Sequence, residues 1–342
     1  MLRIALLCSV VATALIPAAA RGSLVFNRDP FTPSVWVAAD DGSGAKRLAT
    51  GSQPRISPDG ATVAYMVIGS SRSFRPDLMV VPADGSASPR RLVEGWRESF
   101  TFAWSPDSRS VAALIGPELG RRRLVLIDVA TGARRTVARG YFSGVSFSPG
   151  GDELVYGRAT SERYPLRSDV WRAPVAAGGA EPVAVTTDHR SQTPLWGPSG
   201  RVVFVKLVDA DRRKYGPKNE LYVMAPDGSG AKRLTKTKVA QLLQGLVPTG
   251  WSADGARLLA EFGGQDTSYA EIVDPLTGRH KPVVKAVESG FVGARLSADG
   301  TTILGATGGV DPGAKHDVVT IPYGGGRRTM LARGAYDPDW NR

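Results

Sequence analysis

The eight residues DGSGAKRL occur twice in this chain, at Asp41–Leu48 and again at Asp227–Leu234. They are the best-preserved copies of a longer unit, in which an apolar strand leads into a turn rich in Gly, Asp or Thr and then into a polar stretch that ends in aliphatic residues. The seven copies of this unit begin at Val35, Leu78, Leu124, Val170, Leu221, Ala270 and Val318. Glycine permits the positive φ of tight turns and aspartate bonds its own backbone, so each copy is predicted to be a β-hairpin.

A second motif alternates with the first and reads, in one copy, PRISPDGATVAYM from Pro54. Each copy is a short strand, a four-residue turn and a strand of alternating apolar and polar residues. The other complete copies begin at Phe102, Val145, Pro194, Thr249 and Ala294. A seventh copy, YDPDWNR from Tyr336, stops with the chain and places Trp340 in the slot that Trp104, Trp196 and Trp251 occupy. These tryptophans are predicted to pack between neighbouring units.

Together the two motifs predict an all-β fold, a β-propeller with four antiparallel strands per blade and a period of about 47 residues. Residues 22–50 supply three strands of a unit, and residues 336–342 supply the first strand that this unit lacks. The C-terminal strand is therefore expected to complete the first blade and close the ring, which protects both sheet edges. Seven blades fit the repeat count, with six as the alternative. Residues 21–342 are predicted to be one propeller domain.

The first twenty residues have the pattern of a signal peptide. Arg3 precedes the apolar stretch Ile4–Ile16, Pro17 interrupts it, and Ala18–Ala20 offers a cleavage site. An N-terminal membrane anchor is the alternative. The only cysteine, Cys8, lies in this stretch, so a cleaved chain would have no disulfide, thiolate nucleophile or cysteine-bound metal. We expect an exported protein, periplasmic or extracellular, without an integral membrane segment after cleavage.

The copies SPDG at Ser57 and LYVMAPDGSGAKRLT at Leu221 resemble the repeat of TolB-like propellers, a relative of the WD repeat. The resemblance covers essentially all of residues 22–342 and implies the fold, whereas proteins with this repeat include scaffolds, gating domains of peptidases and a few lyases. Two departures stand out. The sequence has no counterpart of the small α/β domain that precedes the TolB propeller, and it has no G-x-S-x-G motif of a hydrolase.

Three histidines limit metal and acid–base chemistry. His280 is expected at the surface of an outer strand, whereas His189 and His316 are expected in loops on one face of the ring. Oligogalacturonate lyases, propellers of a similar repeat, use several histidines and a metal ion. A metal-dependent lyase that acts on acidic glycans, or another propeller enzyme, is therefore the alternative function. The repeated Asp59, Asp107, Asp254 and Asp299 are assigned to turns, and no catalytic residue, metal ligand or cofactor is predicted.

The loops between the second and third strands differ most between the copies. The four that begin at Gly69, Gly116, Arg158 and Val208 hold twelve Lys or Arg and seven Asp or Glu, in a chain of net charge +11. Arginine and aromatic residues are enriched at binding hot spots, although a solvated loop fringe would have the same composition. The predicted binding residues are Arg72, Arg75, Trp96, Arg122, Tyr141, Arg163, Arg167, His189, Arg212, Arg213 and Tyr215.

These features favour a non-enzymatic binding module over an enzyme. Its expected partner is a protein or an anionic polymer of the cell envelope, recognised through the loop-rich face. Nucleic acid is excluded by the export signal despite the basic charge. We expect a monomer.

Overall fold

The computed structural model describes residues 23–68, 76–94, 102–116, 122–159, 167–209, 217–237, 243–264, 267–284, 290–308 and 314–341. The predicted signal peptide lies outside these residues. Every regular element of the described segments is a β-strand. Within them, no helix has the length and apolar character needed to cross a membrane. The chain is therefore an all-β protein, as the repeat motifs predict.

The strands form five hydrogen-bonded sheets. The first contains β27 (Ala335–Trp340), β1 (Ser23–Arg28), β2 (Ser34–Ala39) and β3 (Lys46–Thr50), in that order. The second contains β4 (Ser52–Ile56), β5 (Thr62–Ile68), β6 (Pro76–Pro82) and β7 (Arg90–Val93). The last contains β23 (Phe291–Leu296), β24 (Thr302–Thr307), β25 (Asp317–Pro322) and β26 (Thr329–Arg333).

Two larger sheets lie between these. One contains β8 (Phe102–Trp104), β9 (Ser110–Ile115), β10 (Arg122–Asp128), β11 (Arg134–Phe147), β12 (Glu153–Ala159), β13 (Ser168–Pro174) and β14 (Val183–Ala184). The other contains β15 (Ser191–Trp196), β16 (Val202–Asp209), β17 (Pro217–Met224), β18 (Lys232–Arg233), β19 (Leu243–Trp251), β20 (Leu258–Gly264), β21 (Ser268–Val273) and β22 (His280–Pro282). Strand β11 is long enough to end one group of strands and begin the next. The group of β15 to β18 joins that of β19 to β22 through one parallel pairing, between Asn219 and Gly245.

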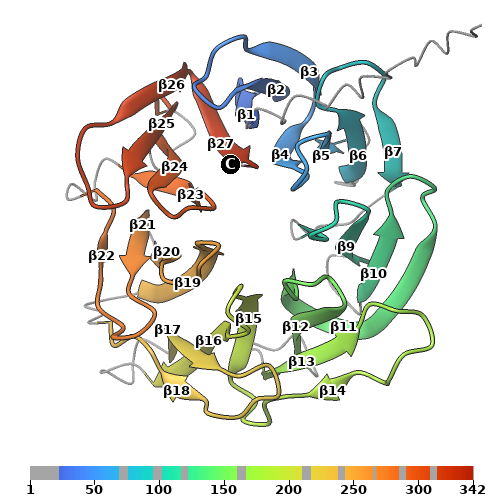
Figure 1. Cartoon of the computed structure of the whole chain (residues 1–342), viewed down its shortest axis with the longest axis vertical. Helices are drawn as coiled ribbons and strands as arrows, with labels where there is room; N and C mark the ends of the chain where they lie inside the picture. The colour runs from blue at the N-terminus through green and yellow to red at the C-terminus, as the bar shows by residue number, and fades with distance from the viewer. Residues whose placement is uncertain are drawn as a thin grey trace, which may run out of the picture.

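The groups of strands stand around a common centre in chain order, the radial arrangement of a β-propeller (Figure 1). Strand β27 pairs antiparallel with β1, with Trp340 opposite Leu24 and Ala335 opposite Arg28. The Ser23 amide also donates a hydrogen bond of 2.7 Å to Asn341 Oδ1. The first sheet thus holds both ends of the described chain.

The repeated DGSG turn has two physical requirements. Asp41 Oδ1 accepts a hydrogen bond from the Ser43 amide at 2.8 Å, and Asp227 binds the Ser229 amide in the same way at 2.9 Å. The glycine that follows each aspartate has a φ of +83° at Gly42 and +87° at Gly228. A Cβ at either glycine would overlap a backbone carbonyl oxygen of an adjoining group, Leu331 or Val185. The string recurs because each of the two turns needs glycine both for its conformation and for its contact with the adjoining group.

The turn of the second motif is held by its serine and aspartate. Ser57 Oγ donates to Asp59 Oδ1 at 2.5 Å and accepts from the Thr62 amide at 2.9 Å. The Ser105–Asp107, Ser252–Asp254 and Ser297–Asp299 pairs repeat the first of these bonds. The repeated aspartates therefore serve the turns, as predicted. Apolar side chains fill the space between adjoining groups; one such cluster joins Phe26 and Trp340 of the first sheet to Leu304 and Val318 of the last.

Candidate functional site

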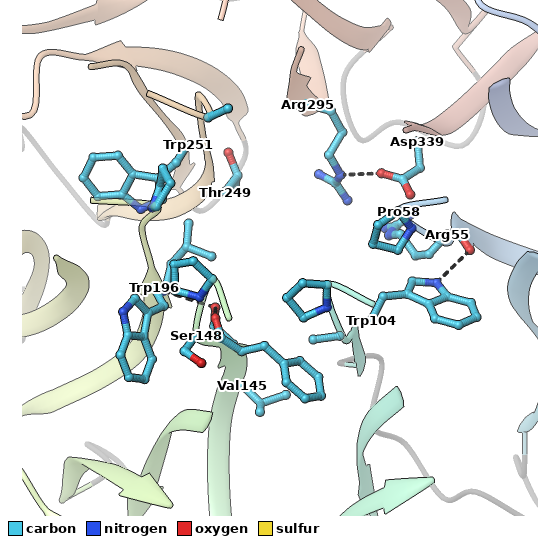
Figure 2. Close-up of a pocket in the computed structure, with 18 of the residues that line it drawn as sticks. Arg55, Pro58, Trp104, Val145, Ser148, Trp196, Thr249, Trp251, Arg295 and Asp339 are labelled. Carbon is cyan, nitrogen blue, oxygen red and sulfur yellow. Dashed lines mark hydrogen bonds and ion pairs between the residues drawn. The ribbon is translucent and has the colours of Figure 1, made fainter. Parts of the chain in front are cut away.

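A cavity of about 660 Å³ lies at the centre of the ring. Its walls are formed by the ends of β4, β8, β11, β15, β19, β23 and β27 and by the turns that follow several of these strands (Figure 2). Pro58, Pro106, Pro149 and Pro198 of these turns belong to its lining. The cavity therefore lies on the face of the ring that carries the repeated turns, which we call the turn face. The opposite face, where the second strand of each group ends and the third begins, is the loop face.

The inner strand of each group is the one that lines the cavity: β4, β8, β11, β15, β19, β23 or β27. At one position of this strand the residue type differs strongly between the copies. This position lies two residues before the first residue of the turn. Its occupants around the ring are Arg55, Ala103, Ser146, Leu195, Gly250, Arg295 and Asp339. All of them except Gly250 line the cavity. The charged occupants come from β4, β23 and β27, so the cavity has one charged wall. Comparison of the loops alone does not reveal this variation, because it lies inside the repeat itself.

The charged wall is a chain of ion pairs that crosses three strands. Arg295 Nε lies 3.1 Å from Asp339 Oδ1, and the other carboxylate oxygen of Asp339 accepts the Ile56 amide at 3.0 Å. Arg55 Nη1 lies 3.0 Å from Asp337 Oδ1. Burial raises the pKa of Asp339, an effect that Arg295 and Arg55 oppose through their charges. These contacts hold β27 against β4 on one side and β23 on the other.

The facing wall is aromatic. Phe102, Trp104, Phe147, Trp196 and Trp251 line it together with the turn prolines. Trp104 Nε1 donates a hydrogen bond of 3.2 Å to the Arg55 carbonyl oxygen (Figure 2). The Nε1 atoms of Trp196 and Trp251 are buried and have no hydrogen-bond partner among the described residues. These aromatic rings therefore offer the cavity carbon surface rather than hydrogen-bonding groups.

Four of the predicted binding residues are described: Arg122, Tyr141, Arg167 and His189. The other predicted residues, Arg72, Arg75, Trp96, Arg163, Arg212, Arg213 and Tyr215, lie outside the described residues. Arg167 and His189 are brought together in a hollow of about 350 Å³, which Asp188, Arg190, Leu207, Asp209 and Pro217 also line. Arg122 starts β10, where it pairs with Gly140, the neighbour of Tyr141 on β11.

His189 is the most constrained of these residues. Its φ of +56° is in the left-handed region, which non-glycine residues seldom adopt. Asp169 holds it there, because its carboxylate accepts the His189 amide at 3.0 Å and lies 2.7 Å from His189 Nδ1. The nearby cations are balanced: Lys206 pairs with Asp188 and Arg190 with Asp209. This hollow therefore has little net charge beyond that of Arg167.

The other histidines are separate from this pair. His316 lines a third hollow, and its Nδ1 lies 2.9 Å from the Thr307 carbonyl oxygen. His280, expected at the surface, is half-buried and pairs with Glu271 at 2.5 Å, which raises the pKa of His280. In the described segments, no three His, Cys, Asp or Glu side chains are grouped so that they could hold a metal ion.

An exposed phenylalanine lies on the loop face. Phe31 is 86% exposed, the largest exposed fraction among the described large hydrophobic residues. It lies between β1 and β2 in the sequence DPFTP, where Asp29 Oδ1 accepts the amides of Phe31 and Thr32 at 3.0 and 3.1 Å. The Thr32 hydroxyl also donates to Asp29. The neighbouring Pro30 lines the third hollow, of about 510 Å³, whose other lining residues include Lys315, His316, Arg333 and Tyr336.

Solved structures of other proteins share this fold. TolB from Acinetobacter baumannii is 16% identical, with a TM-score of 0.56, over 94% of this chain and 82% of that chain. An oligogalacturonate lyase in complex with manganese is also 16% identical, with a TM-score of 0.62, over 92% and 86%. The propeller domain of the Trilobed protease from Pyrococcus furiosus, described as having an open velcro topology, is 14% identical, with a TM-score of 0.64, over 92% and 93%.

No model of a protein family matches the chain, and no curated protein sequence matches it either. The structural matches span most of the chain at low identity, so they establish architecture rather than activity. The chain has the β-propeller fold of the TolB propeller domains, which lyases and peptidase propellers also share.

Proposed function

We propose that this chain is an exported, non-enzymatic binding module that recognises an acidic protein of the cell envelope through its loop face. The observation that carries the proposal is Phe31, an aromatic side chain displayed in solvent on a turn that its own hydrogen bonds hold. An anionic envelope polymer is the alternative ligand for the same face. The binding residues predicted from the sequence are proposed as the rim of this face; they include Arg122, Tyr141, Arg167 and His189.

Phe31 has the properties of an interface anchor. Aromatic residues are enriched among the few side chains that dominate binding energy. Asp29 accepts hydrogen bonds from the two residues that follow Pro30, and Pro30 and Pro33 restrict the backbone on either side. A side chain ordered before binding loses less conformational entropy when it is captured. The adjoining hollow contributes Lys315 and Arg333 against one carboxylate, Asp317, a balance that favours an acidic partner.

The architecture that presents this face is also part of the proposal. We infer a ring of seven blades, closed by β27 within the first blade. The support is the number of repeat copies, the seven inner strands around one cavity, and the pairing of β27 with β1. A protein of this kind would act as a monomer, and the N-terminal pattern of residues 1–20 supports its export.

Site-specific photocrosslinking tests the proposed function. The full-length chain would carry p-benzoylphenylalanine in place of Phe31 or, as the control, in place of Leu276, which is 74% exposed in the turn between β21 and β22. We expect irradiated cells to give one discrete protein adduct from position 31 and none from position 276. Exchanging Arg333 for Glu should weaken that adduct. Equal adducts from both positions, or none from position 31, would reject the protein-binding proposal.

A salt titration separates the polymer alternative. Binding of the purified protein to immobilised dextran sulfate should be unaffected by Phe31→Ala if only charge is recognised. It should fall steeply between 0.1 and 1 M salt, because the screening length falls from about 10 Å to about 3 Å over that range. Retention that resists salt and a Phe31-dependent protein adduct would together favour the protein partner.

A further inference from the structure

We propose that the central cavity is a second binding site, separate from the loop face, which takes a carboxylate carried on a flat apolar group. The cavity combines a wall that can donate hydrogen bonds with a wall of aromatic carbon, and it opens on the turn face. The proposal does not depend on the function assigned to the loop face.

Arg55 is the donor for the carboxylate. Its hydrogen bonds within the described chain all use Nη1, which binds Asp337 at 3.0 Å and the Pro54 carbonyl oxygen at 2.7 Å. The guanidinium has two further nitrogen atoms with N–H groups, Nε and Nη2, and neither is among the buried atoms without a partner. The side chain lines the cavity and is 25% exposed. It can therefore offer Nε–H and Nη2–H together, the paired geometry that suits a carboxylate.

The acidic residues of the wall do not cancel this preference. Asp339 accepts hydrogen bonds from Arg295 and from the Ile56 amide, and Asp337 pairs with Arg55. Figure 2 shows the Arg295 guanidinium between Asp339 and the open centre of the cavity. The carboxylate groups are thus occupied at the wall, whereas guanidinium groups face the space. The formal charge of the four side chains is zero, so a ligand is held by directed hydrogen bonds rather than by net attraction.

The aromatic wall defines the rest of the ligand. Phe102, Trp104 and Trp251 present ring surface, and the turn prolines extend it. The cavity volume of about 660 Å³ is within the range of small-molecule pockets, about 300–1,000 Å³. A flat apolar group against this wall would leave its carboxylate near Arg55. Either a free aromatic acid or the C-terminal residue of a peptide has this chemistry.

Titrations of the intact protein test the site, with tryptophan fluorescence as the readout because Trp104, Trp196 and Trp251 line the cavity. The probes are 3-phenylpropionate, its uncharged analogue 3-phenylpropanol, and a tripeptide that ends in Phe with a free or amidated C-terminus. We expect a saturable fluorescence change with 3-phenylpropionate. The affinity for the alcohol should be at least about tenfold lower, since a hydrogen bond to a charged group is lost. Stronger binding of the free-ended tripeptide than of 3-phenylpropionate would identify a peptide end as the ligand, and the reverse order a free acid.

Two variants locate the site. Arg55→Gln should lower the affinity for 3-phenylpropionate at least about tenfold and leave the affinity for 3-phenylpropanol unchanged. Ala103→Leu fills the cavity without touching an ion pair and should abolish both signals while the melting temperature is kept. Arg167→Ala, on the loop face, is the matched control and should change neither. Equal affinity for acid and alcohol, no saturable signal, or binding that survives Ala103→Leu would overturn the proposal.

Discussion

Arg295 on β23 and Asp339 on β27 form an ion pair of 3.1 Å between two strands that share no hydrogen-bonded ladder. The same carboxylate accepts the Ile56 amide of β4 at 3.0 Å. The residue Asp339 is 9% exposed, and its side chain thus joins three inner strands from three sheets.

Asp339→Ala should destabilise the protein by about 2–4 kcal/mol, because it leaves a half-buried guanidinium and a buried amide without their acceptor. Urea unfolding measures the change. Asp209→Ala is the control, since the Asp209 side chain is 84% exposed and its ion pair with Arg190 is worth about 0–1 kcal/mol. Equal losses of unfolding free energy in the two variants would show that the contacts of Asp339 do not stabilise the fold.

Removal of residues 335–342 tests ring closure. The truncated chain would lose Trp340 from the core cluster and the partner strand of β1. Loss of one large buried aromatic alone costs about 3–5 kcal/mol. We expect a much lower melting temperature by calorimetry. A truncated protein that melts with the full-length chain would disprove closure by β27.

The two glycines of one repeated turn should respond differently to alanine. Gly228 and Gly230 both have positive φ, +87° and +64°, but only a Cβ at Gly228 would overlap the neighbouring carbonyl of Val185. Gly230→Ala should cost about 1–2 kcal/mol from its backbone conformation alone. Gly228→Ala should cost more, since the two groups of strands must also separate. Thermal unfolding of both variants, run side by side, decides whether that contact matters.

Glu220 on β17 is fully buried and should tolerate change poorly. It accepts hydrogen bonds from Arg233, from the Thr235 hydroxyl and from both the amide and hydroxyl of Thr237, and it lies 3.7 Å from buried Lys218. Glu220→Ala should cost about 3–5 kcal/mol, because the buried ammonium loses its counter-charge. Glu94→Ala, whose side chain is 78% exposed, is the control. A loss below about 1 kcal/mol in equilibrium unfolding would contradict this account.

The His280–Glu271 pair should make stability depend on pH. The hydrogen bond that His280 donates to Glu271 raises the pKa of His280 above its ordinary value of 6.5. The folded protein then binds the proton more tightly than the unfolded chain. The stabilisation is complete below pH 6.5 and is lost as the pH rises through the raised pKa. The difference in unfolding free energy between the wild type and His280→Gln should shrink over that interval, and a constant difference would exclude the pair as its source.

The strands and turns were predictable from the sequence because they depend on local chemistry that recurs. The Ser57–Asp59 hydrogen bond and the positive φ of Gly42 each depend on only a few neighbouring residues. Each copy of either motif therefore predicts the same turn. The charged wall was not predictable in this way. Arg55, Arg295 and Asp339 meet only because β27 lies beside both β4 and β23, a relationship that no single repeat contains.

The loop face was predicted in part. The variation between loops identified Arg167, and the survey of the three histidines identified His189; the structure brings the two into one hollow. Composition could not reveal the constraint on His189, because Asp169, which holds it, lies on a separate strand, β13. Phe31 was missed for a related reason: a phenylalanine between two prolines has no periodic pattern that tells exposure from burial.

The hydrogen bond between Ser23 and Asn341 also determines how the molecule would be oriented when tethered. Asn341 lies against Gly60, which belongs to one of the turns of the turn face. Strand β1 starts beside Asn341, at Ser23, and runs toward the loop face. Ser23 and Asn341, the ends of the described chain, therefore both lie at the turn face. A short tether at Ser23 or Asn341 would direct Phe31 outward and place the mouth of the central cavity toward the support.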